Sequence, residues 1–270
     1  MNLIVDLQYF PSVILYKNVD KFSNIVFEQY EHYQKMSFRN RCQITGAGGL
    51  INLSVPLEKG RDQKTLLKDV RISDRGDWQA QHWKTILSCY SRSPWFEFYR
   101  DELEGLYRKP FHFLLDWNLT CFEWSLRILQ MPVSFALTEE YHKKYEEGNW
   151  TDWRGKLLPK FREVGVLSQD PAGNIQGPET PEPDPTGNMQ EPKTPGPDLA
   201  GNIPAGNIQR LGTPEPDPAG STRQPAEPMS ATPVKYRQVF EERIGFLPNL
   251  SILDLLFCEG KNARVLLQKH

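Results

Sequence analysis

Short apolar runs in the first 73 residues predict β-strands separated by turns and one helix. LIVDLQ at residues 3–8 and IVFE at residues 25–28 are typical of buried strands, and the apolar spacing across residues 13–22, just after Pro11, predicts a helix between them. RCQITGAGGLINLSVPL predicts a hairpin that turns at GAGG, and DVRIS at residues 69–73 predicts a further strand. The strands are expected to end near Ser73.

Helical periodicity replaces this pattern in the next part of the chain. WQAQHWKTILSCYSRS repeats large side chains on one helix face, with Asp77 as its N-cap. A second helix is expected to be capped by Ser93, to have Pro94 in its first position and to end at Pro110. FHFLLDWNLTCFEWSLRIL predicts a third helix that ends before Pro132. Strands followed by helices predict an α/β fold with a strand-rich N-terminal half.

A segment rich in Pro, Gly and Asn divides the chain. Residues 170–233 repeat variants of DPAGNIQGPETPEPDPTGN and carry almost no large apolar side chains, so burial cannot offset the entropy of ordering them. We therefore predict a disordered insertion at 169–233 that acts as a passive spacer. The last segment is too short for a core of its own. Residues 234–270 are predicted to return as helices that complete a single domain with residues 1–168.

Composition and charge narrow the class of protein. With 39% apolar residues among 270, the chain can bury a sizeable core, and a net charge of −2 argues against nucleic acid as a partner. The four cysteines are scattered without a CxxC pair, which argues against a metal site and for reduced thiols. The opening residues lack the basic start of a signal peptide, and no window reaches the roughly 18 apolar residues of a membrane span. We expect a cytoplasmic protein with no membrane span.

A cluster of cations stands out in EHYQKMSFRNRC, residues 31–42. Lys35, Arg39 and Arg41 lie within seven residues, and the two arginines are expected to share one face of a strand. Paired guanidinium groups can bind a phosphate or carboxylate through several donors, which predicts an anion clamp. The alternative is a solvated basic strand edge that prevents edge-to-edge pairing.

Two histidines could act as a general acid or base, because imidazole titrates near neutral pH. His32 lies beside the cations and His82 lies on the helix predicted for QAQHWK, although either could instead be a packing residue. Cys42 follows Arg41, which could stabilise a thiolate, but its place in a predicted strand favours a buried structural thiol. The motifs GxSxG, GxGxxG, HExxH and the P-loop are absent from the sequence.

Several blocks of sequence together resemble the WbqC-like family of bacterial proteins. The resemblance covers nearly all of the chain outside the repeats, and its last block supports the return of the C-terminal segment to the domain. The blocks are DLQYFPSV, EHYQKMSFRNRCQI, LSVPLEKG, KDVRIS, WQAQHWKTI, SPWFEFY, DWNL and FLPNLSILDLLFCEG. The resemblance implies a role in O-antigen or other surface polysaccharide synthesis, with aminoacyl (glycyl-type) transfer to an amino sugar as the activity.

The resemblance also favours a functional role for the matching residues. Phosphates of a nucleotide-linked sugar or of an acyl donor would be bound by the cations, and His32 or His82 would accept a proton from the sugar amine. Asp254 would hold one histidine in its working tautomer, or would face water as a polar helix residue. Substrate-binding roles are expected for Gln8, Tyr9, Lys35, Arg39, Asn40, Arg41 and Trp83.

Two other classes of function remain open from the sequence. A non-catalytic module that binds a sugar or nucleotide-linked sugar could use the aromatic residues Tyr9, Phe10, Trp83, Trp95 and Phe96, although aromatics at helical spacing are usually core. A nucleotide-dependent ligase or nucleotidyltransferase would also fit an early strand followed by basic residues. The sequence predicts no particular cofactor.

Overall fold

The computed structural model describes residues 1–58, 64–146, 148–157 and 232–269, which belong to one compact unit formed by residues 1–159 and 208–270. Residues 169–231 of the predicted insertion lie outside the described residues. The strands are β1 (Asn2–Val5), β2 (Asn24–Phe27), β3 (Arg41–Gly46), β4 (Gly49–Ser54), β5 (Phe135–Leu137) and β6 (Trp150–Asp152). The helices are α1 (Val13–Val19), η1 (Leu67–Asp69), α2 (Trp78–Tyr90), α3 (Phe96–Arg108), α4 (Leu114–Leu129), α5 (Glu241–Ile244), α6 (Ile252–Glu259) and α7 (Asn262–Gln268).

Four strands form a parallel sheet in the order β5-β2-β1-β6. The central strand β1 is almost entirely buried, because parallel strands are covered on both faces and so favour continuous apolar runs such as LIV. Helix α1 connects β1 to β2, as parallel pairing requires a crossover. Strand β3 pairs with β4 in a separate antiparallel hairpin whose two-residue turn lies between Gly46 and Gly49.

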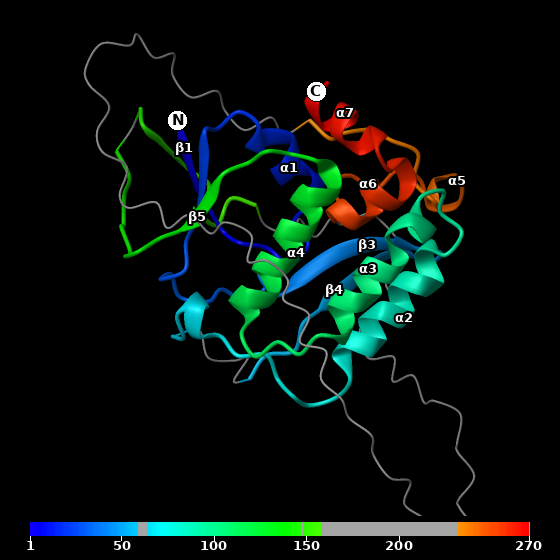
Figure 1. The fold of residues 1–270 in the computed structure, drawn as a ribbon, viewed down its shortest axis with the longest axis horizontal. Coiled ribbons are helices and arrows are strands. Elements are labelled where there is room, and N and C mark those ends of the chain that lie inside the picture. The colour runs from blue at the N-terminus through cyan, green and yellow to red at the C-terminus, as the bar shows by residue number, and fades with distance from the viewer. Residues whose placement is uncertain (59–63, 147, 158–231, 270) are drawn as a thin grey trace, which may run out of the picture. The chain divides into compact units, whose positions relative to one another are not determined.

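Helices pack around both sheets (Figure 1). Local hydrogen bonds and backbone conformations determine where two of these helices begin and end. Helix α2 begins after Asp77, whose side chain accepts from the Ala80 N–H at 3.3 Å. Helices α2 and α3 lie side by side. Helix α4 ends at Gln130, which takes a left-handed conformation with φ of 53°.

The C-terminal segment packs against the first part of the chain. Helix α6 contacts α1, α3 and β3, and α7 contacts α1. Ser251 caps α6, its Oγ donates to the Phe10 carbonyl at 3.0 Å, and its N–H donates to the Gln43 carbonyl at 2.7 Å. Residues that are more than 200 positions apart in sequence therefore build one core.

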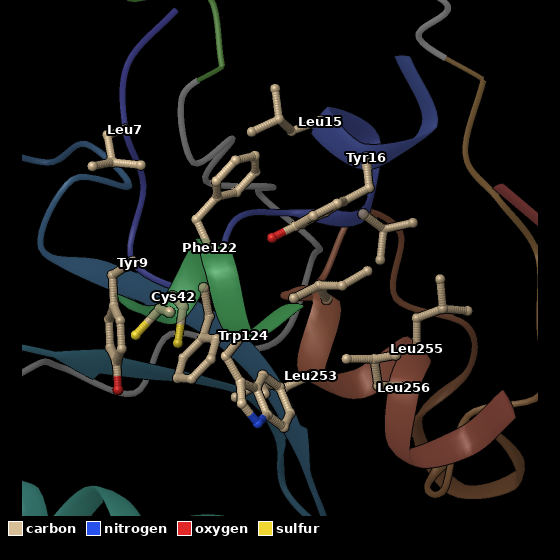
Figure 2. Packing of buried hydrophobic residues seen from close by; sticks show 14 of the residues in the cluster. Leu7, Tyr9, Leu15, Tyr16, Cys42, Phe122, Trp124, Leu253, Leu255 and Leu256 are labelled. Carbon is tan, nitrogen blue, oxygen red and sulfur yellow. The ribbon is translucent and has the colours of Figure 1, made fainter. Parts of the chain in front are cut away.

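That core is rich in aromatic side chains. Figure 2 shows Tyr9, Cys42, Phe122 and Leu253 in one buried cluster, from the segment after β1 and from β3, α4 and α6. The Phe10 ring packs edge-on against Trp117, which is fully buried. Such tilted and edge-to-face pairs fill the space between elements and favour one arrangement of the helices.

The α/β fold class and the strand-rich N-terminal half are confirmed, whereas several boundaries differ from expectation. Helix α1 begins at Val13 with Ser12 as N-cap, and α3 begins at Phe96 with Trp95 in the cap position. The predicted strand at residues 69–73 is wrong, because this segment follows the short 3-10 helix η1 and makes only isolated bridges, from Arg71 and Ile72.

The prediction that strands end near residue 73 is also wrong. Strands β5 and β6 follow α4 in the chain and form the two outer strands of the parallel sheet. Each has only three residues, which is too short for alternation to be visible in the sequence. These two strands complete the edge at which the candidate functional site lies.

Candidate functional site

Polar side chains follow the parallel strands at their carboxyl ends. Asp6 follows β1, Glu28 follows β2, Thr138 follows β5, and Asp152 ends β6. Parallel strands present their carboxyl ends at one edge, so these residues gather there although they come from distant parts of the chain. Hydrogen bonds join them in part, since the Thr138 hydroxyl donates to Glu28 Oε1 at 2.9 Å.

The order of the strands makes this edge a favourable place for a ligand. From β1 the chain moves outward to β2 and β5, and β6 then pairs with the other side of β1. The direction of winding therefore reverses between β1 and β6. In open α/β sheets, ligands bind outside the carboxyl ends of the strands at such a switch point. Asp6 and Asp152 flank it.

A buried guanidinium group connects the switch point to the segment before β3. The Arg39 side chain is 1% exposed, and its Nη2 donates to Asp6 Oδ1 at 2.5 Å and to Glu31 Oε2. Asp6 also accepts the N–H of Gly155 through Oδ2 at 2.7 Å. Burying a charge costs free energy unless the charge is paired. The buried charge of Arg39 is paired with two carboxylates of the same protein.

Arg154 makes a second ionic connection at the same edge. Its Nη1 donates to Glu28 Oε2 at 3.2 Å and its Nη2 donates to Asp152 Oδ2 at 2.7 Å. The guanidinium also lies over the rings of Tyr141 and Tyr145, 5.4 and 5.1 Å from their centroids. Arg154 therefore fixes the β5–β6 connection against the end of the sheet.

Of the two carboxylates that contact Arg39, Glu31 is the more exposed. Its side chain is 20% exposed, compared with 5% for Asp6. Partial burial raises the pKa of Glu31 above its ordinary value, although the charge of Arg39 opposes that shift. A carboxylate with a raised pKa is a stronger base. Because it is also partly open to solvent, Glu31 can exchange a proton with a bound molecule.

The predicted anion clamp takes a different form in the structure. The guanidinium of Arg39 is enclosed by Asp6 and Glu31, so it cannot serve as an open anion ligand, and Arg39 precedes β3 rather than sharing a strand face with Arg41. Lys35 is exposed and Arg41 is half-buried.

Both polar atoms of the Asn40 side-chain amide make hydrogen bonds within the protein. It accepts from the Tyr33 hydroxyl at 2.8 Å and donates to the Val55 carbonyl at 3.0 Å. Gln8 is also buried, and its Oε1 accepts from the Ser12 N–H at 3.3 Å. Both amides therefore hold backbone groups of the loops around the site.

His82 lies inside the aromatic core with Tyr9 and Trp83. The Tyr9 hydroxyl is 3.0 Å from His82 Nδ1 and 2.6 Å from the Tyr107 hydroxyl, and Trp83 stacks on Phe96. Burial lowers the pKa of His82 to about 4, although a hydrogen bond with the backbone of Ser54 opposes the shift. His82 is therefore neutral at physiological pH and is held between structural partners.

His32 and Asp254 lie in other environments. The exposed His32 donates from Nδ1 to the Lys64 carbonyl at 2.8 Å. Asp254 accepts from the Tyr90 and Tyr236 hydroxyls at 2.5 and 2.6 Å, so its oxygens orient tyrosines where the sequence suggested a histidine. The structure thus does not bring the predicted catalytic residues His32, His82 and Asp254 into contact with one another.

The thiol of Cys42 is an unsuitable nucleophile. It is buried, and burial raises its pKa well above the ordinary value, so the thiolate is disfavoured. Within the described ranges, no group of three or more His, Cys, Asp or Glu side chains is placed to hold a metal ion. The described helices likewise include none with the length and apolarity to cross a membrane.

The sequence interpretation missed Asp6, Glu28, Glu31, Asp152 and Arg154 as a group. One signal was available, because LIVD and IVFE both place an acidic residue at the end of a buried strand. Acidic residues in that position of two parallel strands share one edge. The contribution of β6 had no comparable signal in its three residues.

A comparison of the chain with models of known protein families gave a match. A family model described as the WbqC-like protein family matches residues 8–168, which is more than half of the chain. The chain belongs to the WbqC-like protein family. The matched range of this WbqC-like protein includes Glu28, Glu31, Arg39 and Arg154 but begins two residues after Asp6. Comparisons with curated proteins and with solved structures found no match.

Proposed function

We propose that this protein transfers an acyl or aminoacyl group to the amine of a sugar during synthesis of a bacterial surface polysaccharide. The observation that carries the proposal is the partly exposed carboxylate of Glu31. Arg39 contacts this carboxylate and connects it to Asp6 at the switch point. Membership of the WbqC-like family agrees with this activity, which the resemblance implied from the sequence.

The charges at the site favour an amine as the acceptor. Four carboxylates outnumber two guanidinium groups among Asp6, Glu28, Glu31, Asp152, Arg39 and Arg154. This local excess of carboxylates would attract an ammonium group, and Lys35 and Arg41, which would hold the donor, are outside this set. An ammonium group must lose a proton before it can act as a nucleophile, and Glu31 is the carboxylate placed to accept it.

The transfer itself forms one bond and breaks one. The neutral nitrogen attacks the carbonyl carbon of an activated acyl donor, and the carbon–nitrogen bond forms as the bond to the leaving group breaks. The proton of the ammonium group passes through Glu31 to solvent. As the amide forms, Glu31 accepts the second proton from nitrogen and gives it to the leaving group, which departs with its electron pair. Arg39 acts as a positioning residue, because its contacts with Asp6 and Glu31 fix the carboxylate.

The anionic part of a donor or nucleotide-linked sugar would lie against Lys35 and Arg41. Lys35 is exposed and Arg41 is half-buried, and both are close in sequence to Glu31. Cations at this position would neutralise phosphate groups and orient the substrate. His32, which is exposed and follows Glu31 in the sequence, is a second candidate for proton transfer.

Mass spectrometry of reaction mixtures tests the activity. The full chain is incubated with a nucleotide-linked amino sugar and a panel of acyl thioesters and aminoacyl donors, with and without ATP. We expect a product whose mass rises by the acyl group minus one hydrogen, and no consumption of ATP. The absence of product with every donor, or formation of ADP or AMP, would contradict transfer and favour the binding-module or ligase interpretation.

A further inference from the structure

An exposed aromatic ring lies beside the ionic network at the end of the sheet. The Tyr141 side chain is 50% exposed, and Arg154, which pairs with Glu28 and Asp152, lies over its ring. We infer that Tyr141 and Asp152 form the subsite that binds the sugar ring of the acceptor. This inference rests on the proposed function, because it names how the amino sugar is held while its amine reaches Glu31.

The ring of Tyr141 is held in place before any ligand binds. Arg154 Nη1 donates to the His142 carbonyl at 2.9 Å, so the backbone next to the ring is fixed to the same guanidinium that contacts the ring. Tyr145 contacts the guanidinium as well and packs on Trp150, with 4.7 Å between the ring centroids. A binding surface that is already ordered loses little conformational entropy when a ligand binds.

Asp152 supplies acceptors beside that ring. Its Oδ1 accepts from the backbone N–H and from Nε of Arg154 at 2.9 and 3.1 Å, and its Oδ2 accepts from Nε and Nη2 of Arg154 at 3.2 and 2.7 Å. The side chain is nevertheless 36% exposed, and a carboxylate has about four acceptor positions. The exposed part of this carboxylate can still accept a hydrogen bond from a sugar hydroxyl.

An aromatic face beside an exposed carboxylate fits the chemistry of a sugar. A pyranose ring has a face of C–H groups, which packs on an aromatic ring, and a rim of hydroxyl groups, which donate to carboxylates. Gly155, which follows Arg154 in the chain, donates its N–H to Asp6 at 2.7 Å, and Asp6 shares Arg39 with Glu31, so the subsite adjoins the residues that hold the proposed base. A sugar bound on Tyr141 would therefore lie beside the ionic network that holds Glu31.

Saturation-transfer NMR with free glucosamine as the probe tests the subsite without requiring turnover. Irradiation of protein aromatic protons in the full chain should transfer saturation to the ring protons of the sugar. The Tyr141→Ala variant should bind glucosamine about tenfold more weakly, while Tyr141→Phe should stay within about twofold of the unmodified chain. Phe98→Ala is the matched control, because Phe98 is 72% exposed on α3 and outside the subsite.

The outcomes separate this inference from the proposed activity. Loss of binding in Tyr141→Ala with retention in Tyr141→Phe and Phe98→Ala supports the subsite, whether or not an acyl product is found. Absence of saturation transfer to glucosamine in the unmodified chain overturns it, as does equal binding by Tyr141→Ala. Acyl product formed at an unchanged KM for the sugar by Tyr141→Ala would also overturn the subsite while supporting the transfer reaction.

Discussion

Arg39 and Asp6 form a buried ion pair with 2.5 Å between Nη2 and Oδ1, although 33 residues separate them in sequence. The pair joins the end of the central strand to the segment before the hairpin, and it also supports Glu31. Such a contact sets the geometry of the site, because a buried guanidinium between two carboxylates has few alternative positions.

Replacing Arg39 should therefore be strongly destabilising. Arg39→Met leaves the carboxylates of Asp6 and Glu31 without their shared cation, and the free energy of unfolding should fall by about 3–5 kcal/mol. Arg108→Met is the control, since the Arg108–Glu104 pair is exposed and should contribute at most about 0.5 kcal/mol. Urea unfolding measures both, and similar losses in the two variants would contradict a structural role for the buried pair.

The close packing of Gly260 against Trp95 gives a second prediction. A Cβ at Gly260 would lie 2.1 Å from Trp95 Cδ2, and the residue has φ of 54°, so Gly260→Ala should lower the free energy of unfolding by about 1–3 kcal/mol. Gly48→Ala meets no atom within 4 Å and should change it by less than about 0.5 kcal/mol. Thermal unfolding compares the two variants. A Gly260→Ala variant as stable as the unmodified chain would show that the end of α6 does not pack closely against Trp95.

Asp254 should make stability depend on pH. Burial raises its pKa to about 6 from an ordinary value near 3.8, so the folded state binds this proton more tightly than the unfolded state. The contribution of Asp254 is therefore fully present below about pH 4 and is lost as pH rises through about 6.

The Asp254→Asn variant, which does not titrate at this position, isolates that contribution. The free energy of unfolding of the variant minus that of the unmodified chain should rise by up to about 3 kcal/mol between pH 4 and pH 7. Urea unfolding at a series of pH values gives this difference. A difference that stays constant or falls with pH would contradict the raised pKa.

His82 should stay neutral far below the pH at which an ordinary histidine is protonated. Its lowered pKa of about 4 reflects burial beside Tyr9, and the folded state therefore disfavours the imidazolium. The stability that this neutral ring contributes is present above about pH 6.5 and is lost as pH falls toward 4. NMR titration of the imidazole carbons measures the pKa directly, and a midpoint near 6.5 would indicate a solvent-accessible ring.

Some of this arrangement was accessible from the sequence and some was not. The buried run LIV and the Asp77 cap predicted β1 and the start of α2, because burial and capping act on neighbouring residues. The partners of Arg39 were not predicted, since the contacts with Asp6 depend on how the chain folds back after β2. The same reason explains why Asp254 meets Tyr90 and Tyr236 rather than a histidine.

Charged residues that are close together in sequence have different surroundings in the fold. Lys35, Arg39 and Arg41 look alike as a cluster, yet one guanidinium is enclosed by carboxylates while the lysine faces solvent. Sequence proximity does not reveal which charges are already neutralised by the fold. The acidic residue at the end of each buried strand was the more informative signal.

The rate of acyl transfer by Glu31→Gln tests the central claim most directly. Glutamine keeps an acceptor for Arg39 but cannot accept a proton from the amine, so product formation should fall at least about a hundredfold, with the thermal unfolding midpoint close to that of the unmodified chain. The control Glu97→Gln, on the exposed face of α3, should retain full activity. Transfer by Glu31→Gln at the rate of the unmodified chain would contradict the role of this carboxylate as the base.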